Sequence, residues 1–320
     1  MFNFLGGLFV LIAVLTWSIA SIVYKSVLGS VGDQKKYSRD PLASLGIRIL
    51  ILSAFILLYN LSLGNINKMF ITMNTEQMTL YFYITILCGF LTAIGDICYF
   101  FALRYLDASR VYPLINTQTL FTIPFAYYFF NEQIPALMWI SSFLMIIGVL
   151  FVGGTQDSKD KGMENLSKQQ IKRNYIKGIS CGIGTGFCFG TQYLAMTALN
   201  RIYFGVMEAN MARVVSYAII LWIILLLKPN HIPRIRNDVE KKSFKSYILT
   251  GLIGIFSFGI GDAVYQLGVS LNGAQTSIII ASSAPIFNQA FSILVLKEKL
   301  RKNFLLGVFC IIVGNILVVF

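Results

Sequence analysis

Apolar residues are gathered in ten long runs that are separated by polar connections. Each run holds roughly 18–25 residues, which is enough for a helix to cross a hydrocarbon core about 30 Å thick. The pattern therefore predicts an all-α polytopic membrane protein with ten transmembrane helices. The predicted spans are 3–24, 42–63, 80–104, 109–130, 135–154, 176–199, 205–227, 246–270, 274–296 and 303–320.

The sequence consists of two copies of one repeat unit. A polar linker at residues 155–175 separates a first five-helix repeat, 1–154, from a second, 176–320. The motif Ile94-Gly95-Asp96-Ile97-Cys98-Tyr99 returns 166 residues later as Ile260-Gly261-Asp262-Ala263-Val264-Tyr265, and the same offset holds without a gap beyond it. Because five is an odd number, the second copy should enter the membrane from the opposite face, which predicts inverted repeats.

The composition and the charge distribution support a membrane protein. With 56% hydrophobic residues, 12% charged residues and a mean hydropathy of +0.71, the chain is not expected to fold as a water-soluble globule. The net charge of +12 does not indicate a nucleic-acid partner, because 22 of the 26 Lys and Arg residues lie in connections on one predicted side. Only Lys68 and Arg201 lie on the other side. The positive-inside rule predicts a cell-membrane protein with both termini outside.

An aspartate lies deep in a predicted helix of each repeat, at Asp96 and Asp262. Ionisable groups inside a membrane are costly, so both are candidates for proton or ion coupling. A static role is the alternative, in which Asp96 pairs with Arg48 and Asp262 pairs with Arg213. The two arginines have further alternatives, namely contact with an anionic substrate or snorkelling to the interface. Tyr99 and Tyr265, each three residues after an aspartate, lie on the same helical faces.

Polar side chains gather near prolines in the fourth and ninth predicted helices. Asn116 precedes Pro124 in the fourth helix, and Ser282 and Asn288 flank Pro285 in the ninth. A proline kinks a helix and frees a carbonyl, and transporters hold substrate at such interruptions. The alternative is that these groups join helices across a dry interface.

Glycines at every fourth position, Gly178, Gly182, Gly186 and Gly190, predict a packing face on the sixth helix. Gln192 follows these glycines in the far half of the sixth helix, and Trp17 lies in the comparable part of the first helix. Both are therefore candidates to cap a cavity. The candidate substrate-binding residues are therefore Asn116, Ser282, Asn288, Tyr99, Tyr265, Trp17 and Gln192.

Several classes of site are not expected. The five cysteines all lie in apolar runs, and the single histidine, His231, lies in a polar connection, so neither predicts a metal site. No nucleotide-binding or catalytic motif is present, so we expect no enzyme activity and no cofactor. The expected partners are a small-molecule substrate, the lipid bilayer and protons, with a monomer or a homodimer as the assembly.

The order of several short motifs resembles EamA-type transporters of the drug/metabolite transporter superfamily. The resemblance implies ten helices and a secondary transporter of small metabolites that works by alternating access. Two departures are the uncharged tails and the Gly-Asp pair of each repeat, which that family does not generally share. The similar stretches are Thr16-Trp17-Ser18, Lys25, Arg48, Ala108-Ser109, Asn131-Glu132-Gln133, Gly148, Arg213, Asn272-Gly273-Ala274-Gln275-Thr276, Ala284-Pro285-Ile286-Phe287, Leu296-Lys297-Glu298-Lys299-Leu300, Gly307 and Gly314.

The hypothesis from the sequence is thus a secondary transporter or exporter of a small metabolite, with proton coupling or exchange. The alternative from a different class is an integral membrane sensor or scaffold that transports nothing.

Overall fold

The computed structural model describes residues 3–29, 40–131, 136–153, 167–227, 244–297 and 304–319, and in these ranges it is helical without strands. Most of the predicted linker, together with His231, Glu132 and Glu298, lies outside these ranges. The described elements are α1 (Phe4–Leu28), α2 (Pro41–Ser62), α3 (Asn65–Thr72), α4 (Thr75–Tyr105), α5 (Ala108–Ile115), α6 (Gln118–Phe130), α7 (Ala136–Gly153), α8 (Lys168–Ile202), α9 (Val206–Leu226), α11 (Phe244–Gly254), η2 (Ile255–Gly261), α12 (Asp262–Ala281), α13 (Ala284–Phe291), η3 (Ser292–Leu296) and α14 (Phe304–Val319).

Five of the described helical stretches are long and apolar enough to cross a membrane on their own. They are Phe4–Leu28, Pro41–Ser62, Thr75–Tyr105, Val206–Leu226 and Tyr247–Ala281. The other predicted spans are occupied by helices that are shorter, broken or more polar. Ten crossings therefore remain a prediction, while a multi-pass helical membrane protein agrees with the structure.

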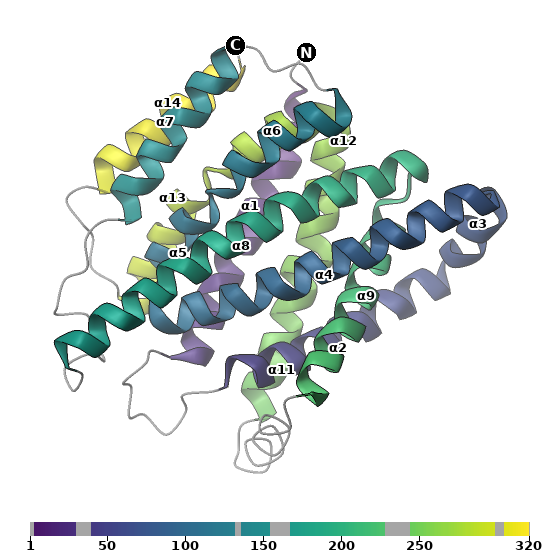
Figure 1. The fold of residues 1–320 in the computed structure, drawn as a ribbon, viewed down its shortest axis with the longest axis horizontal. Coiled ribbons are helices and arrows are strands. Elements are labelled where there is room, and N and C mark those ends of the chain that lie inside the picture. The colour runs from purple at the N-terminus through teal and green to yellow at the C-terminus, as the bar shows by residue number, and fades with distance from the viewer. Residues whose placement is uncertain are drawn as a thin grey trace.

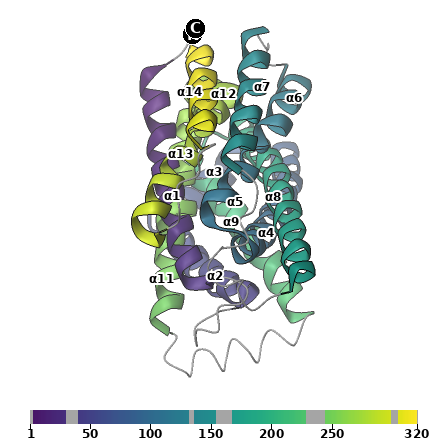
Figure 2. The ribbon, with the colours of Figure 1, turned by 90° about the vertical axis from the view of Figure 1, so that its left-hand side faces the viewer.

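The helices of the two halves pack against each other in a reciprocal way. Helix α1 packs along α12, while α8, the first helix of the second half, packs along α4. Helices α7 and α14, which end the two halves, lie side by side (Figure 1 and Figure 2). Figure 1 also shows that α1 begins at the end of the molecule where both termini lie, whereas α8 begins at the opposite end. Each half is thus completed by helices of the other.

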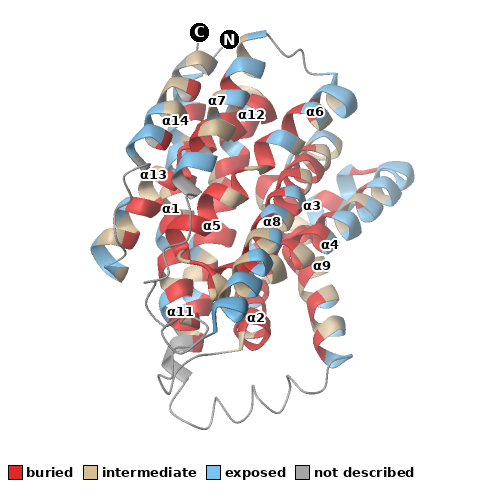
Figure 3. Ribbon diagram, turned by 60° about the vertical axis from the view of Figure 1, so that its left-hand side comes forward, coloured by how far each residue is buried: buried red, intermediate tan, exposed pale blue. Residues whose placement is uncertain are grey.

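The distribution of burial differs from that in a water-soluble protein on the surface and around the charges. Large apolar side chains such as Leu58, Phe82 and Phe143 are exposed. Figure 3 shows exposed positions along the outer sides of the helices. Arg48 and Asp96, by contrast, are fully buried. Since water would disfavour so much exposed apolar surface, the outer faces suit the hydrocarbon core of a bilayer.

Two helices begin earlier than hydrophobicity alone predicts. Helix α8 begins at Lys168 rather than at 176, because Ser167 and Gln170 form a capping box that satisfies backbone N–H groups of the first turn. Asn74 and Gln77 do the same for α4, which begins at Thr75 rather than at 80. Polar first turns of this kind extend a helix beyond its apolar run.

The fourth and ninth predicted helices are each broken in the middle. The first break, at 116–117, separates α5 from α6, and the second, at 282–283, separates α12 from α13. The two breaks are related by the 166-residue offset of the repeat. Pro285 lies in the first turn of α13, as a kink at this proline requires, but the expectation for Pro124 is wrong. It lies inside the unbroken helix α6, and the break lies upstream of it.

A π-helix, η2, precedes Asp262 in the eighth predicted helix. This wider winding leaves some carbonyls without their usual i+4 donor, so they are available to other helices. The counterpart of this stretch in the first repeat lies within α4, which is α-helical throughout. The two repeats therefore differ close to their aspartates.

Glycines allow the closest approaches between helices. A Cβ at Gly89 of α4 would lie 2.1 Å from Ser216 Oγ and 2.7 Å from Tyr217 N of α9. The glycine face of α8 packs on α5, α6 and the end of α4, as predicted, since Cβ atoms at its four positions would overlap atoms there. Positions such as Gly184 are different, because a Cβ there would make one ordinary contact, with Cys98 Sγ at 3.6 Å.

We expect Gly89→Ala to lower the free energy of unfolding by about 1–3 kcal/mol, because the added methyl group forces α4 and α9 apart. Gly184→Ala is the matched control and should leave stability unchanged or slightly raised, since alanine favours a helix. Thermal unfolding of both variants in detergent checks this. Equal melting temperatures for the two variants would contradict the close α4–α9 contact.

Candidate functional site

Each half holds a buried ion pair between two of its own helices. Arg48 of α2 pairs with Asp96 of α4, and both side chains have no exposed surface. In the second half Arg213 of α9 pairs with Asp262 of α12, with 2.7 Å between Nη2 and Oδ2. These are the partners that the static interpretation of the aspartates names. Neither guanidinium snorkels to the surface.

A side chain from the opposite half completes each pair. Tyr217 of α9 donates a hydrogen bond from its hydroxyl to Asp96 Oδ2 at 2.6 Å, and accepts one from Arg48 Nη2 at 3.1 Å. Trp17 of α1 donates its indole N–H to Asp262 Oδ1 at 2.8 Å. Breaking either pair therefore disturbs contacts between the halves as well as within one half.

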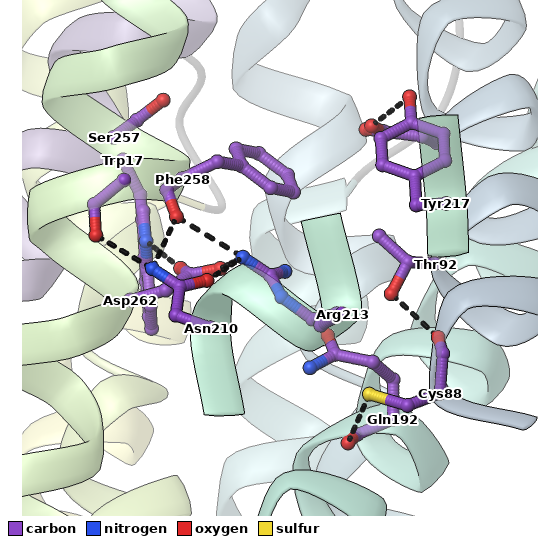
Figure 4. A network of polar contacts seen from close by, with 12 residues as sticks. Trp17, Cys88, Thr92, Gln192, Asn210, Arg213, Tyr217, Ser257, Phe258 and Asp262 are labelled. Atoms are coloured by element: carbon purple, nitrogen blue, oxygen red, sulfur yellow. Dashed lines mark hydrogen bonds and ion pairs between the residues drawn. The ribbon is translucent and has the colours of Figure 1, made fainter. Parts of the chain in front are cut away.

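The π-helix supplies further acceptors to the second pair. Arg213 Nη2 donates to the carbonyl of Phe258 at 3.0 Å and to Asn210 Oδ1 at 2.6 Å. Asn210 in turn donates to the carbonyls of Phe258 and Gly259 at 3.1 and 2.8 Å. Figure 4 shows Trp17, Asn210 and Arg213 around Asp262, with Tyr217 apart from this cluster. Arg213 is thus anchored by neutral oxygens as well as by Asp262.

Aromatic rings surround the guanidinium of Arg48. Its carbon Cζ lies 4.5 Å from the ring centre of Phe258, 5.0 Å from that of Phe100 and 5.3 Å from that of Tyr24. Arg213 Cζ lies 5.5 Å from the same Phe258 ring. Such rings stabilise a desolvated cation, and here one ring from the second half contacts both arginines.

A small cavity lies beside the second ion pair, at the interface of the two halves. It offers about 40 Å³ of space that a water-sized sphere can reach, which is room for about two or three water molecules. Tyrosines dominate its polar lining. The lining residues are Trp17, Ala20, Tyr24, Tyr99, Tyr112, Ile115, Asn116, Gln118, Phe189, Tyr193, Ser257, Phe258, Ala281 and Ala284.

The structure places three of the predicted substrate residues, Trp17, Tyr99 and Asn116, on this cavity. Tyr265 lies just behind the lining, with its ring centre 5.2 Å from that of Trp17. The remaining three lie elsewhere. Ser282 accepts a hydrogen bond at its carbonyl from Asn116 Nδ2 at 2.9 Å, and Asn288 bonds to Ser21.

Gln192, the last of these three, lies on α8 and does not reach the cavity lining. Its carbonyl accepts a weak hydrogen bond from the thiol of Cys88 at 3.8 Å, and its side-chain Nε2 is buried and has no hydrogen-bond partner among the residues that the structure describes. It is a neighbour of Tyr193, which does line the cavity.

Sequence reasoning named Trp17 but missed the other residues that bond to or pack on the ion pairs. Asn210 and Tyr217 lie three positions before and four after Arg213, which places them on the face of α9 that carries this arginine. This spacing is a signal that the sequence does contain. Phe258 gave no such signal, because its position depends on the π-helix.

The arrangement provides two buried carboxylates, two fixed guanidinium groups and a small aromatic cavity. Within the described ranges no three His, Cys, Asp or Glu side chains are placed to hold a metal ion. The chemistry available is therefore proton exchange at a carboxyl and recognition of a solute by aromatic faces, hydroxyls and amides.

Comparison with known proteins places this chain among transporters. A family model described as the EamA-like transporter family matches residues 4–154 and 176–320. An uncharacterized transporter of Clostridium kluyveri is 24% identical over 238 residues, which cover 72% of this chain and 70% of that protein. The probable 4-amino-4-deoxy-L-arabinose-phosphoundecaprenol flippase subunit ArnF of Yersinia enterocolitica is 27% identical over 103 residues, 31% of this chain and 77% of that protein.

A protein of known crystal structure has a similar fold. It aligns over 98% of this chain and 95% of its own length, with a TM-score of 0.65 and 12% sequence identity. At this identity the likeness concerns the fold alone. Since the family model covers both halves and the helices are apolar and long, the protein is a multi-pass integral membrane protein that belongs to the EamA-like transporter family.

Proposed function

We propose that the protein is a secondary transporter that moves a small metabolite by alternating access through the cavity between its two halves. The cavity carries this proposal, because its lining comes from α1, α4, α5 and α6 of the first half and from α8, η2, α12 and α13 of the second. Relative movement of the halves would open such a site to one side or the other. The proposed substrate classes are amino acids, sugars, nucleosides and drug-like compounds.

Ten crossings in two inverted five-helix repeats are part of this proposal. The reciprocal packing of α1 with α12 and of α8 with α4 supports it. So does the hydrogen bond from Asn116 to Ser282, because these residues are equivalent in the two repeats. Asn131 and Lys297, also equivalent, have positive φ angles of 51° and 55°. Equivalent backbone features in both halves are what a near-symmetric pair would have.

The conformation described here represents a closed state in this proposal. Space for about two or three water molecules is too small for a metabolite. The helix breaks at 116–117 and 282–283 lie beside the cavity, and interrupted helices move more easily than continuous ones. Opening at these breaks would bring Ser282 and Asn288 toward a substrate that already contacts Asn116.

Energy for transport would come from a proton gradient or from exchange of substrates. Asp96 and Asp262 are the two candidates for carrying a proton, because each is buried in a membrane-spanning segment. Arg48 and Arg213 stay charged and hold the carboxylates in place. A carboxyl that gains a proton loses most of its attraction to the arginine, which is a physical route from proton binding to helix movement.

We expect Asp96→Asn or Asp262→Asn, or both, to reduce pH-driven uptake at least tenfold. Proteoliposomes that contain a pH-sensitive dye and receive a panel of amino acids, nucleosides and sugars provide the measurement. Asp107→Asn is the control, since this partly exposed carboxylate pairs with Arg110 at a helix start. Unaltered pH-driven uptake in both test variants would remove the aspartates from coupling.

The buried pairs also make a prediction about stability. Asp96→Ala should lower the free energy of unfolding by about 3–5 kcal/mol, because it leaves the Arg48 charge buried without a counter-ion. The double variant Arg48→Met with Asp96→Leu should recover most of this loss, since both charges are gone. Denaturant unfolding in mixed micelles compares the two. A double variant as unstable as the single one would show that charge burial is not the cause.

A scaffold or sensor that transports nothing is the alternative, and ligand binding separates the two. We expect a transported metabolite at 100 times its dissociation constant to add about 2.7 kcal/mol to the free energy of unfolding. A thermal-shift screen of the purified protein against the metabolite panel measures this. A scaffold would show no shift with any compound.

A further inference from the structure

The two aspartates differ in their relation to the cavity. Arg48, Asp96 and Tyr217 form a cluster in which no member lines the cavity. Asp262 is also buried, but its partner Trp17 is itself a lining residue. Asp96 is therefore separated from the cavity by Arg48, whose guanidinium lies against the lining rings of Tyr24 and Phe258, while Asp262 is a single hydrogen bond from a lining residue.

The packing of α1 on α12 places Trp17 beside Asp262. A Cβ at Gly261 would lie 2.2 Å from Thr16 Oγ1 and 3.3 Å from Trp17 Nε1, so only glycine allows this approach. The indole ring then packs against two tyrosines, with ring centres 5.8 Å from Tyr193 and 5.2 Å from Tyr265, whose own ring centres are 4.8 Å apart. A change in the position of Trp17 would therefore move the aromatic wall of the cavity.

The hydrogen-bond donors around Asp262 determine what happens when it gains a proton. A neutral carboxyl has one hydroxyl that donates, so it no longer accepts charge-assisted bonds from two neighbours. Arg213 keeps Asn210 Oδ1 and the Phe258 carbonyl as acceptors. Among the described residues, the indole N–H of Trp17 has its hydrogen bond to Asp262 alone. After protonation Arg213 is still held by these two acceptors, whereas the position of Trp17 depends on its bond to Asp262.

The Asp96 cluster responds differently to a proton. The hydroxyl of Tyr217 both donates to Asp96 and accepts from Arg48, so it can rotate and keep one of the two bonds. No ring on the cavity wall depends on this carboxylate alone. The physical consequences of protonation at the two sites are thus unequal.

We propose that Trp17 is the positioning residue through which the cavity and the protonation of Asp262 act on each other. A solute that contacts the indole ring alters the hydrogen bond to Asp262, and a proton on Asp262 alters the wall that the solute meets. Linkage makes the two effects equal in free energy. The inference rests on the proposed function for its role in transport, although the link itself needs no transport.

Other titratable groups on the surrounding helices interact electrostatically with Asp262. They are Arg213 of α9, Arg48 of α2, Tyr193 of α8, Tyr112 of α5, Cys88 of α4 and Tyr265 on its own helix. Arginine stays charged throughout the accessible pH range, and phenols and thiols ordinarily titrate above about pH 8. Below that pH the carboxyl is the group whose charge changes beside Trp17.

Tryptophan fluorescence tests the link directly. The chain has three tryptophans, so Trp139→Phe with Trp222→Phe leaves Trp17 as the single emitter. We expect its emission in detergent or nanodiscs to follow a one-proton titration curve between about pH 4 and about pH 8. Adding Asp262→Asn should abolish the curve, and adding Asp96→Asn, the matched control, should leave it in place.

The possible outcomes decide the proposal. Asp262→Glu keeps the carboxyl and should move the midpoint, which keeps the test decisive if Asp262→Asn does not fold. An emission that does not titrate, a curve that survives Asp262→Asn, or an unmoved midpoint in Asp262→Glu would overturn the link. A titrating Trp17 in a protein without pH-driven uptake would instead contradict the transport proposal and leave the link intact.

Discussion

Two charge pairs buried inside an apolar bundle are the constraint on which the rest of the structure depends. A guanidinium and a carboxylate removed from water cost several kcal/mol each, and their mutual attraction offsets this cost only with good geometry and further hydrogen bonds. The protein supplies those bonds from the opposite half, through Tyr217 at Asp96 and Trp17 at Asp262. Each carboxylate therefore takes a hydrogen bond from the other half, which only the assembled halves supply.

Because each ion pair accepts a hydrogen bond from the other half, helices of one half pack on helices of the other. Helix α1 carries Trp17 to the second pair along α12, and α9 carries Tyr217 to the first pair along α4. Gly261 and Gly89 allow the helix backbones to come close at these two contacts between the halves. The small cavity lies between the same helices, so the polar chemistry and the space for a solute share one interface.

The two repeats are nearly symmetric, but they differ around their aspartates. Equivalent residues Asn116 and Ser282 bond to each other, and equivalent helix breaks lie beside the cavity. The aspartates are equivalent too, yet their partners differ. Asp96 accepts a hydrogen bond from the phenol of Tyr217, which does not line the cavity, and Asp262 accepts one from the indole of Trp17, which does. The π-helix before Asp262 adds a carbonyl acceptor for Arg213, whereas the stretch of α4 before Asp96 is α-helical. Two copies of one unit thus provide two unequal carboxylates.

Much of this organisation was predictable from the sequence, because apolar runs and a repeated motif report directly on helices in a bilayer. The pairings of Arg48 with Asp96 and of Arg213 with Asp262 were among the stated alternatives, since charges inside a membrane need partners. The break after Ile115 was not located, because it depends on a tight turn at Asn116 rather than on Pro124. The role of Phe258 could not be predicted from the sequence, because a π-helix depends on packing that no local pattern encodes.

The most direct test of this account is carbon-13 NMR of the aspartate carboxyls in nanodiscs, with Asp96→Asn and Asp262→Asn used for assignment. The account predicts that the Asp262 signal moves as the pH is changed, whether or not the Asp96 signal moves as well. A moving Asp96 signal beside a fixed Asp262 signal, or two fixed signals, would contradict it.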